Sequence, residues 1–332
     1  MATSTPTVVE PDQRQDGWRF GQAEVVLTVV LALILGHRLL IPLLDSPALR
    51  TWSAIFMAIV IQSTPFLILG VLLAAAISNL LSDGLLDRVV PRNPALAVPV
   101  AGVAGVALIG CECASVPIAS SIIRRGIAPG AALTFLLAAP AVNPIVLVST
   151  AVAFQGKPEM VLARFVASML TAVLVGWVWV WKGNRVPLAM LAGSSHDHGD
   201  RLTGFLNSVQ HDFLQTSGFL VVGASIAAAV NTFVPSSALA AIGHNPVLAV
   251  LALAGFAFVV ALCSQTDAFI AASLVSFSFT ARLVFLVVGP AMDVKLALLE
   301  AGAFGRRFAV VFVPLVLTIA VGCAVAVGSG LL

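Results

Sequence analysis

The sequence predicts an all-α polytopic membrane protein. Hydrophobic residues make up 60% of the 332 residues, charged residues make up only 10%, and the mean hydropathy is +1.07. Soluble domains carry about 25% charged residues, so these values exclude a soluble globular chain. The net charge of +2 comes from scattered residues and gives no reason to expect a nucleic-acid partner. We therefore expect membrane lipid to surround most of the chain.

Nine apolar stretches are long enough to cross a bilayer, for which a helix needs about 20 residues. They cover residues 23–44, 52–81, 95–123, 130–154, 160–181, 210–233, 246–279, 282–304 and 308–331. The third and the seventh exceed one crossing, so we expect each to be a broken helix, or a helix followed by a re-entrant half-helix. The expected number of crossings is about nine, between roughly eight and ten.

Polar segments at the start and in the middle divide the chain further. Residues 1–21 mix both charges and lack the basic-then-apolar pattern of a cleaved signal peptide, so we expect a solvated tail. Residues 22–51 hold an extra N-terminal transmembrane helix and its loop. The polar loop 183–208 carries His196-Asp197-His198, whose imidazole and carboxylate groups suit zinc. A solvated linker is the simpler interpretation of this loop.

The two halves of the chain share a pattern of polar residues, about 150 residues apart. The matched pairs are Gln62 with Gln215, Asn93-Pro94 with Asn245-Pro246, Cys111 with Cys263, and Asn143 with Asp293. Asn143 and Asp293 each follow a proline by three residues, and proline frees a backbone carbonyl within a helix. We therefore expect two tandem repeats, over residues 52–182 and 209–332, which are parallel or inverted depending on the number of crossings.

The most unusual stretch is Gly110-Cys111-Glu112-Cys113-Ala114-Ser115-Val116-Pro117, in the middle of a long apolar segment. A charge at the centre of a membrane helix costs about 2.5–3.5 kcal/mol on insertion scales, so an ionisable residue there indicates a functional site. A single cysteine is often only a small buried hydrophobe. Two thiols that flank a carboxylate, ahead of a helix-breaking proline, favour function. The matched stretch in the second half is Cys263-Ser264-Gln265-Thr266-Asp267.

Transporters built from two repeats hold their solute near the membrane midplane, where interrupted helices of the two halves meet. We expect such a site at the matched polar positions, which are Gln62, Cys111, Glu112, Cys113, Asn143, Gln215, Cys263, Gln265, Asp267 and Asp293. Thiolates bind soft metals and metalloids, so Cys111, Cys113 and Cys263 are the candidate ligands. Glu112 and Asp267 would balance positive charge or carry a coupling proton. The two glutamines fit interhelical hydrogen bonds equally well.

The Cys-Glu-Cys run, followed by Arg124-Arg125-Gly126 and by Ala139-Pro140-Ala141-Val142-Asn143-Pro144, resembles the ArsP/YraQ-like predicted permeases. The resemblance covers roughly residues 52–331 and includes the second cysteine stretch. It implies a multi-pass permease of a bacterial inner membrane, and the best-defined activity in that family is efflux of trivalent organoarsenicals. Many relatives have Cys-Ser-Cys at this position. The extra carboxylate of Glu112 leaves arsenical specificity open and favours a cationic metal.

These observations together predict a secondary permease that exports a small thiophilic solute between its two repeats, without a cofactor. The sequence contains no phosphate loop of the Walker type, so coupling would come from protons or from a partner subunit. One alternative is a divalent-metal permease. Others are an intramembrane thiol redox enzyme, although Cys-x-Cys is shorter than the usual redox spacing, and a non-transporting membrane subunit. A homo-oligomer and a small partner subunit both remain open.

Overall fold

The computed structural model describes residues 46–79, 91, 93–107, 112–182, 201–233, 245–261 and 263–332. The chain separates into two units, residues 1–50 and 51–332, and the second contains the site described below. The expected tail 1–21, the expected helix 23–44 and the His196-Asp197-His198 triplet lie outside the described residues.

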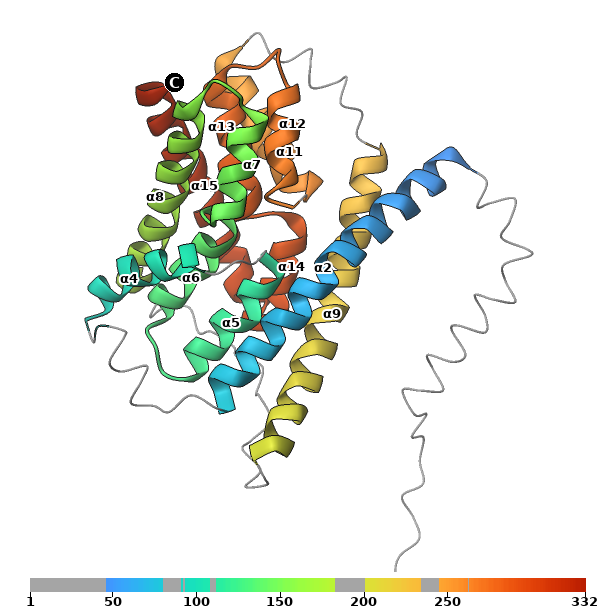
Figure 1. Ribbon diagram of the computed structural model, residues 1–332, viewed down its shortest axis with the longest axis vertical. Coiled ribbons are helices and arrows are strands. Elements are labelled where there is room, and N and C mark those ends of the chain that lie inside the picture. The colour runs from blue at the N-terminus through green and yellow to red at the C-terminus, as the bar shows by residue number, and fades with distance from the viewer. Residues whose placement is uncertain are drawn as a thin grey trace, which may run out of the picture. The chain divides into compact units, whose positions relative to one another are not determined.

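All regular elements of the described residues are α-helices, in agreement with the predicted class (Figure 1). The helices of the first half are α2 (Pro47–Asn79), α4 (Pro94–Ala107), α5 (Glu112–Arg124), α6 (Pro129–Ala141), α7 (Pro144–Ala153) and α8 (Pro158–Lys182). The helices of the second half are α9 (Arg201–Phe233), α11 (Pro246–Val260), α12 (Thr266–Ser273), α13 (Phe279–Ala291), α14 (Val294–Phe304) and α15 (Arg306–Leu331). Helix α9 begins inside the segment expected to be a polar loop, so its first turns are polar.

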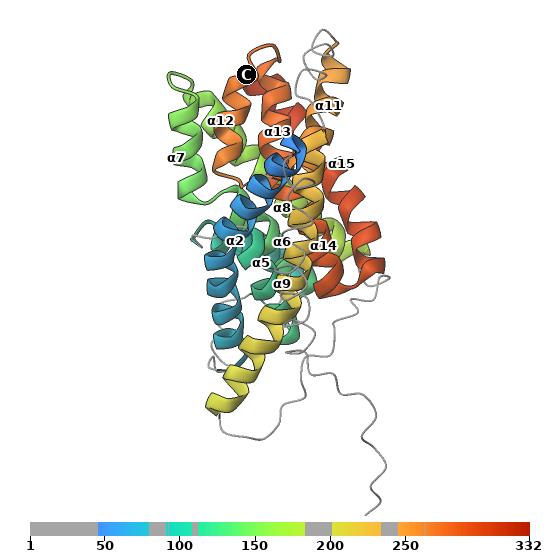
Figure 2. The same cartoon turned by 90° about the vertical axis from the view of Figure 1, so that its right-hand side faces the viewer.

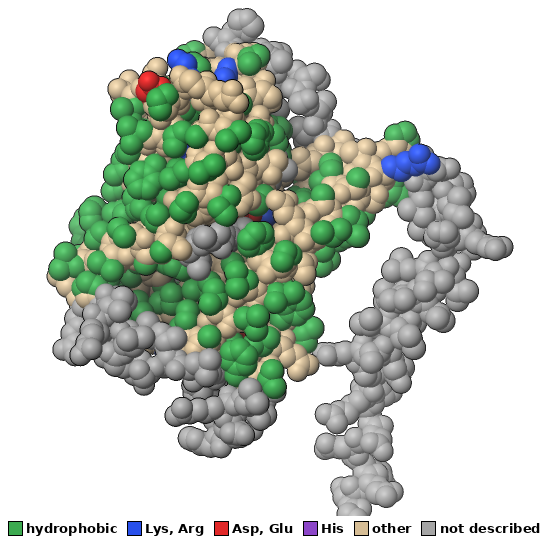
Figure 3. All heavy atoms as spheres, in the orientation of Figure 1, with side chains coloured by type: hydrophobic (Ala, Val, Ile, Leu, Met, Phe, Trp, Pro, Cys, Tyr) green, Lys and Arg blue, Asp and Glu red, His purple; other side chains and the backbone are tan. Residues whose placement is uncertain are grey.

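Five described segments are long and apolar enough to cross a membrane. They are Pro47–Ser78, Pro129–Ala153, Pro158–Lys182, Ser208–Thr232 and Arg306–Leu331. The surface seen in Figure 3 is largely hydrophobic, with few charged side chains, as lipid contact requires. These features support a multi-pass membrane protein, whereas the total of about nine crossings stays a prediction.

Both long apolar stretches consist of two helices, with α4 and α5 in the first and α11 and α12 in the second. Helix α11 ends where Ala261 adopts a left-handed conformation with φ of 49°. Such a conformation is unfavourable for a residue with a side chain and interrupts a right-handed helix. The expectation that Pro117 breaks the helix is wrong, because Pro117 lies inside α5, which starts at Glu112 and continues to Arg124.

Two further breaks divide α6 from α7 and α13 from α14. Asn143 caps the start of α7, where its side chain accepts a hydrogen bond of 3.0 Å from the backbone N–H of Val146. Asp293 caps α14 in the same way, with a bond of 2.6 Å from Leu296. Such caps satisfy backbone donors that would otherwise be unpaired inside the membrane. The two matched residues therefore have a structural role that their spacing from proline did not reveal.

Helices α6 and α13 are almost entirely buried and form the centre of the second unit. Helix α6 packs against α4, α5 and α8, while α13 packs against α11, α12 and α15. The halves meet where α8 packs against α13 and α15 and where α6 packs against α13, and two further contacts lie beside this centre. Helix α7 lies next to α12, and α14 lies next to α5 (Figures 1 and 2). These contacts bring polar residues from both halves together.

Candidate functional site

The buried ion pair between Glu112 and Lys295 is the centre of the candidate site. Glu112 begins α5 in the first half, and Lys295 lies in the first turn of α14 in the second half. Lys295 Nζ donates a hydrogen bond of 2.6 Å to Glu112 Oε1, and each residue is only 2% exposed. The attraction between two buried charges offsets their loss of hydration only when they meet at such close range.

Asp293 lies beside this pair. Its Oδ2 is 4.0 Å from Lys295 Nζ, while its Oδ1 caps α14. Lys295 therefore faces two carboxylates at once. Among the described residues, Glu112 Oε2 and Asp293 Oδ2 have no hydrogen-bond partner. The group of three charges is thus incompletely satisfied and leaves polar atoms available to a bound molecule or water.

A cavity of about 250 Å³ opens against the ion pair, and we call it the Glu112–Lys295 cavity. Its polar lining residues are Gln62 and Ser63 of α2, Glu112, Cys263, Thr266 and Lys295. The remaining lining residues are Ile55, Ala58, Ile59, Phe66 and Ala261. The cavity thus combines one thiol, one ion pair and a largely apolar wall, a composition typical of small-molecule sites.

The cysteines are only partly brought together. Cys263 lines the cavity and is 2.9 Å from Gln265, whose Oε1 can accept the thiol hydrogen. Cys113 is fully buried next to Glu112 in the chain, and Cys111 lies outside the described residues. Within the part of the chain that the structure describes, no three His, Cys, Asp or Glu side chains are grouped as metal ligands. The predicted cluster of three sulfurs therefore stays a prediction.

Arg164 binds the segment between α11 and α12, and the sequence analysis did not identify this residue. This fully buried residue of α8 donates one hydrogen bond of 2.7 Å to Thr150 Oγ1 and another of 2.9 Å to the Ser264 carbonyl. Its positive charge also acts on the buried carboxylate of Asp267 in the first turn of α12. A lone arginine near the start of the apolar stretch 160–181 was the available signal, because such residues in membrane helices are rare and usually functional.

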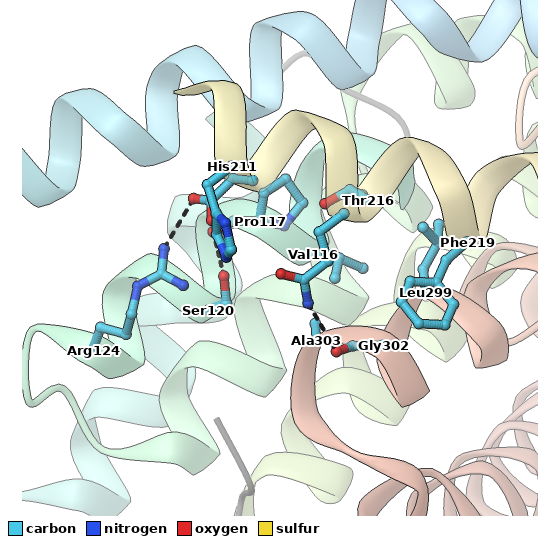
Figure 4. A pocket seen from close by; sticks show the side chains of 12 residues that line it. Val116, Pro117, Ser120, Arg124, His211, Thr216, Phe219, Leu299, Gly302 and Ala303 are labelled. Atoms are coloured by element: carbon cyan, nitrogen blue, oxygen red, sulfur yellow. Dashed lines mark hydrogen bonds and ion pairs between the residues drawn. The ribbon is translucent and has the colours of Figure 1, made fainter. Parts of the chain in front are cut away.

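Gln215 lies in a different place from Gln62, although the two were expected to be equivalent. Gln215 donates a hydrogen bond of 3.2 Å to the Gly302 carbonyl and lines a second, smaller cavity between α5, α9 and α14 (Figure 4). Arg124 and Asp212 form an ion pair of 3.2 Å at the same cavity. Only Gln62 therefore lies near the Glu112–Lys295 ion pair.

Comparison with known proteins gives consistent results. The ArsP family of predicted permeases matches residues 48–329. A Bacillus subtilis protein named UPF0718 protein YcgR is 35% identical over 274 residues, which cover 80% of this chain and 93% of that protein. A Streptococcus mutans protein named "Putative two-component membrane permease complex subunit" is 30% identical over 268 residues, which cover 78% of this chain and 89% of that protein. No solved structure matches the chain.

Proposed function

Because the chain belongs to the ArsP family of predicted permeases and is a multi-pass protein of a bacterial membrane, we propose that it exports a small thiophilic solute through the Glu112–Lys295 cavity. The observation that carries the proposal is that this cavity places the Cys263 thiol beside a buried ion pair that joins the two halves. A solute that enters there would meet groups of both halves at once, as alternating access requires.

The ion pair bears on the charge of the solute. The sequence suggested that Glu112 adds negative charge and favours a cationic metal. In the structure, however, Lys295 compensates Glu112, and Asp293, the other carboxylate beside Lys295, does not line the cavity, so neither acid is a spare ligand for a cation there. A neutral thiophilic species, such as a trivalent organoarsenical bound through one or two thiols, fits the cavity better than zinc. Cys263, which lines the cavity, is the thiol we assign to it.

The order of the helices supports the proposal of two tandem repeats. The six described helices of the first half contain 33, 14, 13, 13, 10 and 25 residues. Those of the second half contain 33, 15, 8, 13, 11 and 26 residues in the same order. A duplicated unit accounts for this agreement, and it places the two broken cysteine segments at equivalent positions.

Transport into everted membrane vesicles tests the proposal. We expect vesicles with the wild-type protein to accumulate methylarsenite, and expect the Cys263→Ser variant to lose most of this accumulation. Cys323→Ser is the matched control, because Cys323 lies in α15 and does not line the cavity. Arsenite, zinc and copper complete the panel. Accumulation of zinc or copper alone would contradict the neutral solute.

A partner subunit is the second point of the proposal, since the streptococcal relative is named as a subunit of a two-component complex. The vesicle experiment should therefore be performed with the chain expressed alone and with the membrane proteins encoded next to it. Accumulation that needs the second protein would support the two-component arrangement, whereas accumulation by the chain alone would contradict it.

A further inference from the structure

Glu300 is a buried acid that the proposed solute site does not use. It lies on α14, the helix that also carries Asp293 at its start and Lys295 in its first turn. Its side chain is 0% exposed, and within the described part of the chain neither carboxylate oxygen has a hydrogen-bond partner. Both oxygens of a carboxylate in a native interior are normally satisfied, so this exception needs an explanation.

The charges around Glu300 offer no compensation. On its own helix the nearest charge that acts on it is that of Asp293, which is also negative. Lys295 is committed to Glu112 at 2.6 Å. The two acids lie seven residues apart, which is about two helical turns, so they share one face of α14.

The helices packed on α14 are α5, α9, α11 and α15, and among their described residues no cation acts on Glu300. Helix α5 contributes Glu112 and Arg124, which are paired with Lys295 and Asp212. The described ionisable side chains of α9 nearby are His211 and Asp212, at the small cavity beside Arg124. Helix α11 has no ionisable residue. Those of α15 are Arg306 and Arg307, which are exposed at its start, and the thiol of Cys323 near its end, which supplies no positive charge.

The same imbalance is visible across the whole buried set. Among the described residues, the buried charged side chains are the acids Glu112, Asp267, Asp293 and Glu300 and the bases Arg164, Arg282 and Lys295. Arg282, which is 8% exposed, donates a hydrogen bond to the Phe277 carbonyl beside the start of α13. Lys295 compensates Glu112, and Arg164 acts on Asp267. The surplus negative charge therefore falls on α14. A buried carboxylate without a cation or a donor becomes neutral by binding a proton.

We propose that Glu300 is a proton-binding site that couples solute export to the proton gradient, an inference that rests on the proposed permease function. The proton adds to a carboxylate oxygen of Glu300 from the side of higher proton concentration and leaves from that oxygen to the other side. Loss of the proton places a second negative charge on the face of α14 that carries Asp293. Lys295 lies about 7.5 Å away from Glu300 along the helix axis. The added negative charge therefore changes the electrostatic field at the Glu112–Lys295 ion pair, which forms one wall of the cavity.

This assignment replaces the expectation that Glu112 or Asp267 carries the proton. Protonation of Glu112 would leave Lys295 with a weakened partner, and protonation of Asp267 would do the same to Arg164. Protonation of Glu300 removes a charge that has no partner among the described residues. Glu300 is therefore the acid that can change its charge without breaking an existing ion pair.

Infrared spectroscopy tests the bound proton without any solute. We expect purified wild-type protein at neutral pH to show the C=O stretch of a protonated carboxylic acid, with a shift in heavy water. This band should be absent from Glu300→Gln and present in Glu300→Asp, which keeps an acid at the position. Glu159→Gln is the control, because Glu159 is exposed at the start of α8. A wild-type minus Glu300→Gln difference spectrum without an acid band would overturn the proposal.

Transport by reconstituted protein tests the coupling. If one proton accompanies each solute, a gradient of one pH unit supports about a tenfold accumulation of methylarsenite. In the Glu300→Gln variant, the accumulation ratio with a pH gradient should fall to the ratio that is measured without a gradient. The variant should still exchange methylarsenite across the membrane when the pH is equal on both sides. Gradient-driven accumulation by Glu300→Gln would overturn the coupling. If wild-type protein moves no solute in either assay, the proposed function fails, and the infrared result alone decides whether Glu300 binds the proton.

Discussion

At the scale of single residues, the Glu112 carboxylate and the Lys295 ammonium group are tolerable in the membrane interior because they meet. Each is almost completely buried, and their closest atoms are 2.6 Å apart. The net stabilisation from a buried pair is small, since desolvation consumes most of the attraction, but one isolated partner is very unfavourable. The pair therefore makes the cavity wall sensitive to the loss of either charge.

We predict that Lys295→Met lowers the free energy of unfolding by about 3–5 kcal/mol, because it leaves Glu112 charged and unpaired. The double variant Glu112→Gln, Lys295→Met should recover part of this loss, because both substituted positions are then neutral and only Asp293 lacks its cation. Denaturant unfolding in detergent measures both. The Arg124→Met variant breaks a more exposed pair, whose acid is 16% and base 29% exposed. It should cost less than about 1 kcal/mol. A double variant as unstable as Lys295→Met would contradict the pairing.

At the scale of elements, two glycines set how closely the long helices approach the short ones. A Cβ atom on Gly70 of α2 would lie 2.5 Å from the Cα of Ala114 in α5. A Cβ on Gly223 of α9 would lie 2.9 Å from the Cα of Lys295 in α14. These are backbone atoms that cannot rotate away. The two glycines thus position the helix starts that carry the ion pair.

We expect Gly70→Ala and Gly223→Ala each to lower the free energy of unfolding by about 1–3 kcal/mol, because overpacking forces the helices apart. Both should also slow methylarsenite transport by moving α5 or α14. Gly218→Ala is the control on α9, since a Cβ there would have no neighbour within 4 Å. Thermal unfolding and vesicle transport measure the effects. Equal stability of Gly218→Ala and Gly223→Ala would show that the close approach does not matter.

Local signals made several helix starts predictable, whereas the breaks before α7 and α14 and the contacts between elements were not. Prolines begin α6, α7 and α11, where a missing N–H costs nothing. Asn143 and Asp293 cap their helices through side chains that accept a hydrogen bond from the backbone N–H three residues later. A break in the stretch 95–123 was expected, but it was expected at Pro117, which lies inside α5. Gln62 and Gln215 match in sequence, yet they line different cavities, because side-chain neighbours depend on packing rather than on sequence pattern.

At the scale of the whole molecule, each half supplies the cation for the broken segment of the other. Lys295 of the second half binds Glu112, 183 residues earlier in the chain, and Arg164 of the first half binds the Ser264 carbonyl, 100 residues later. Such distant partners leave no periodic pattern, so sequence analysis could identify the charged residues but not their partners. Because of these two reciprocal contacts, movement of one half against the other must strain both the stretch that contains Cys113 and the stretch that contains Cys263.

Arg164 offers a test of this exchange through the reactivity of Cys263. We predict that Arg164→Lys speeds alkylation of Cys263, because lysine lacks the planar fork whose two nitrogens reach Thr150 and the Ser264 carbonyl at once. A lost hydrogen bond to a charged group costs about 1.5–3 kcal/mol, which corresponds to roughly a tenfold or greater increase in transient opening.

The experiment uses a chain in which Cys111, Cys113 and Cys323 are serine, so that Cys263 is the one thiol left. Arg282→Lys provides the same substitution elsewhere, at a residue of α13 whose Nε donates to the Phe277 carbonyl. Alkylation should stay at its original rate in that control and rise only in Arg164→Lys. If both variants react like the parent, the first half does not hold the cysteine segment of the second, and the two segments would then move independently during transport.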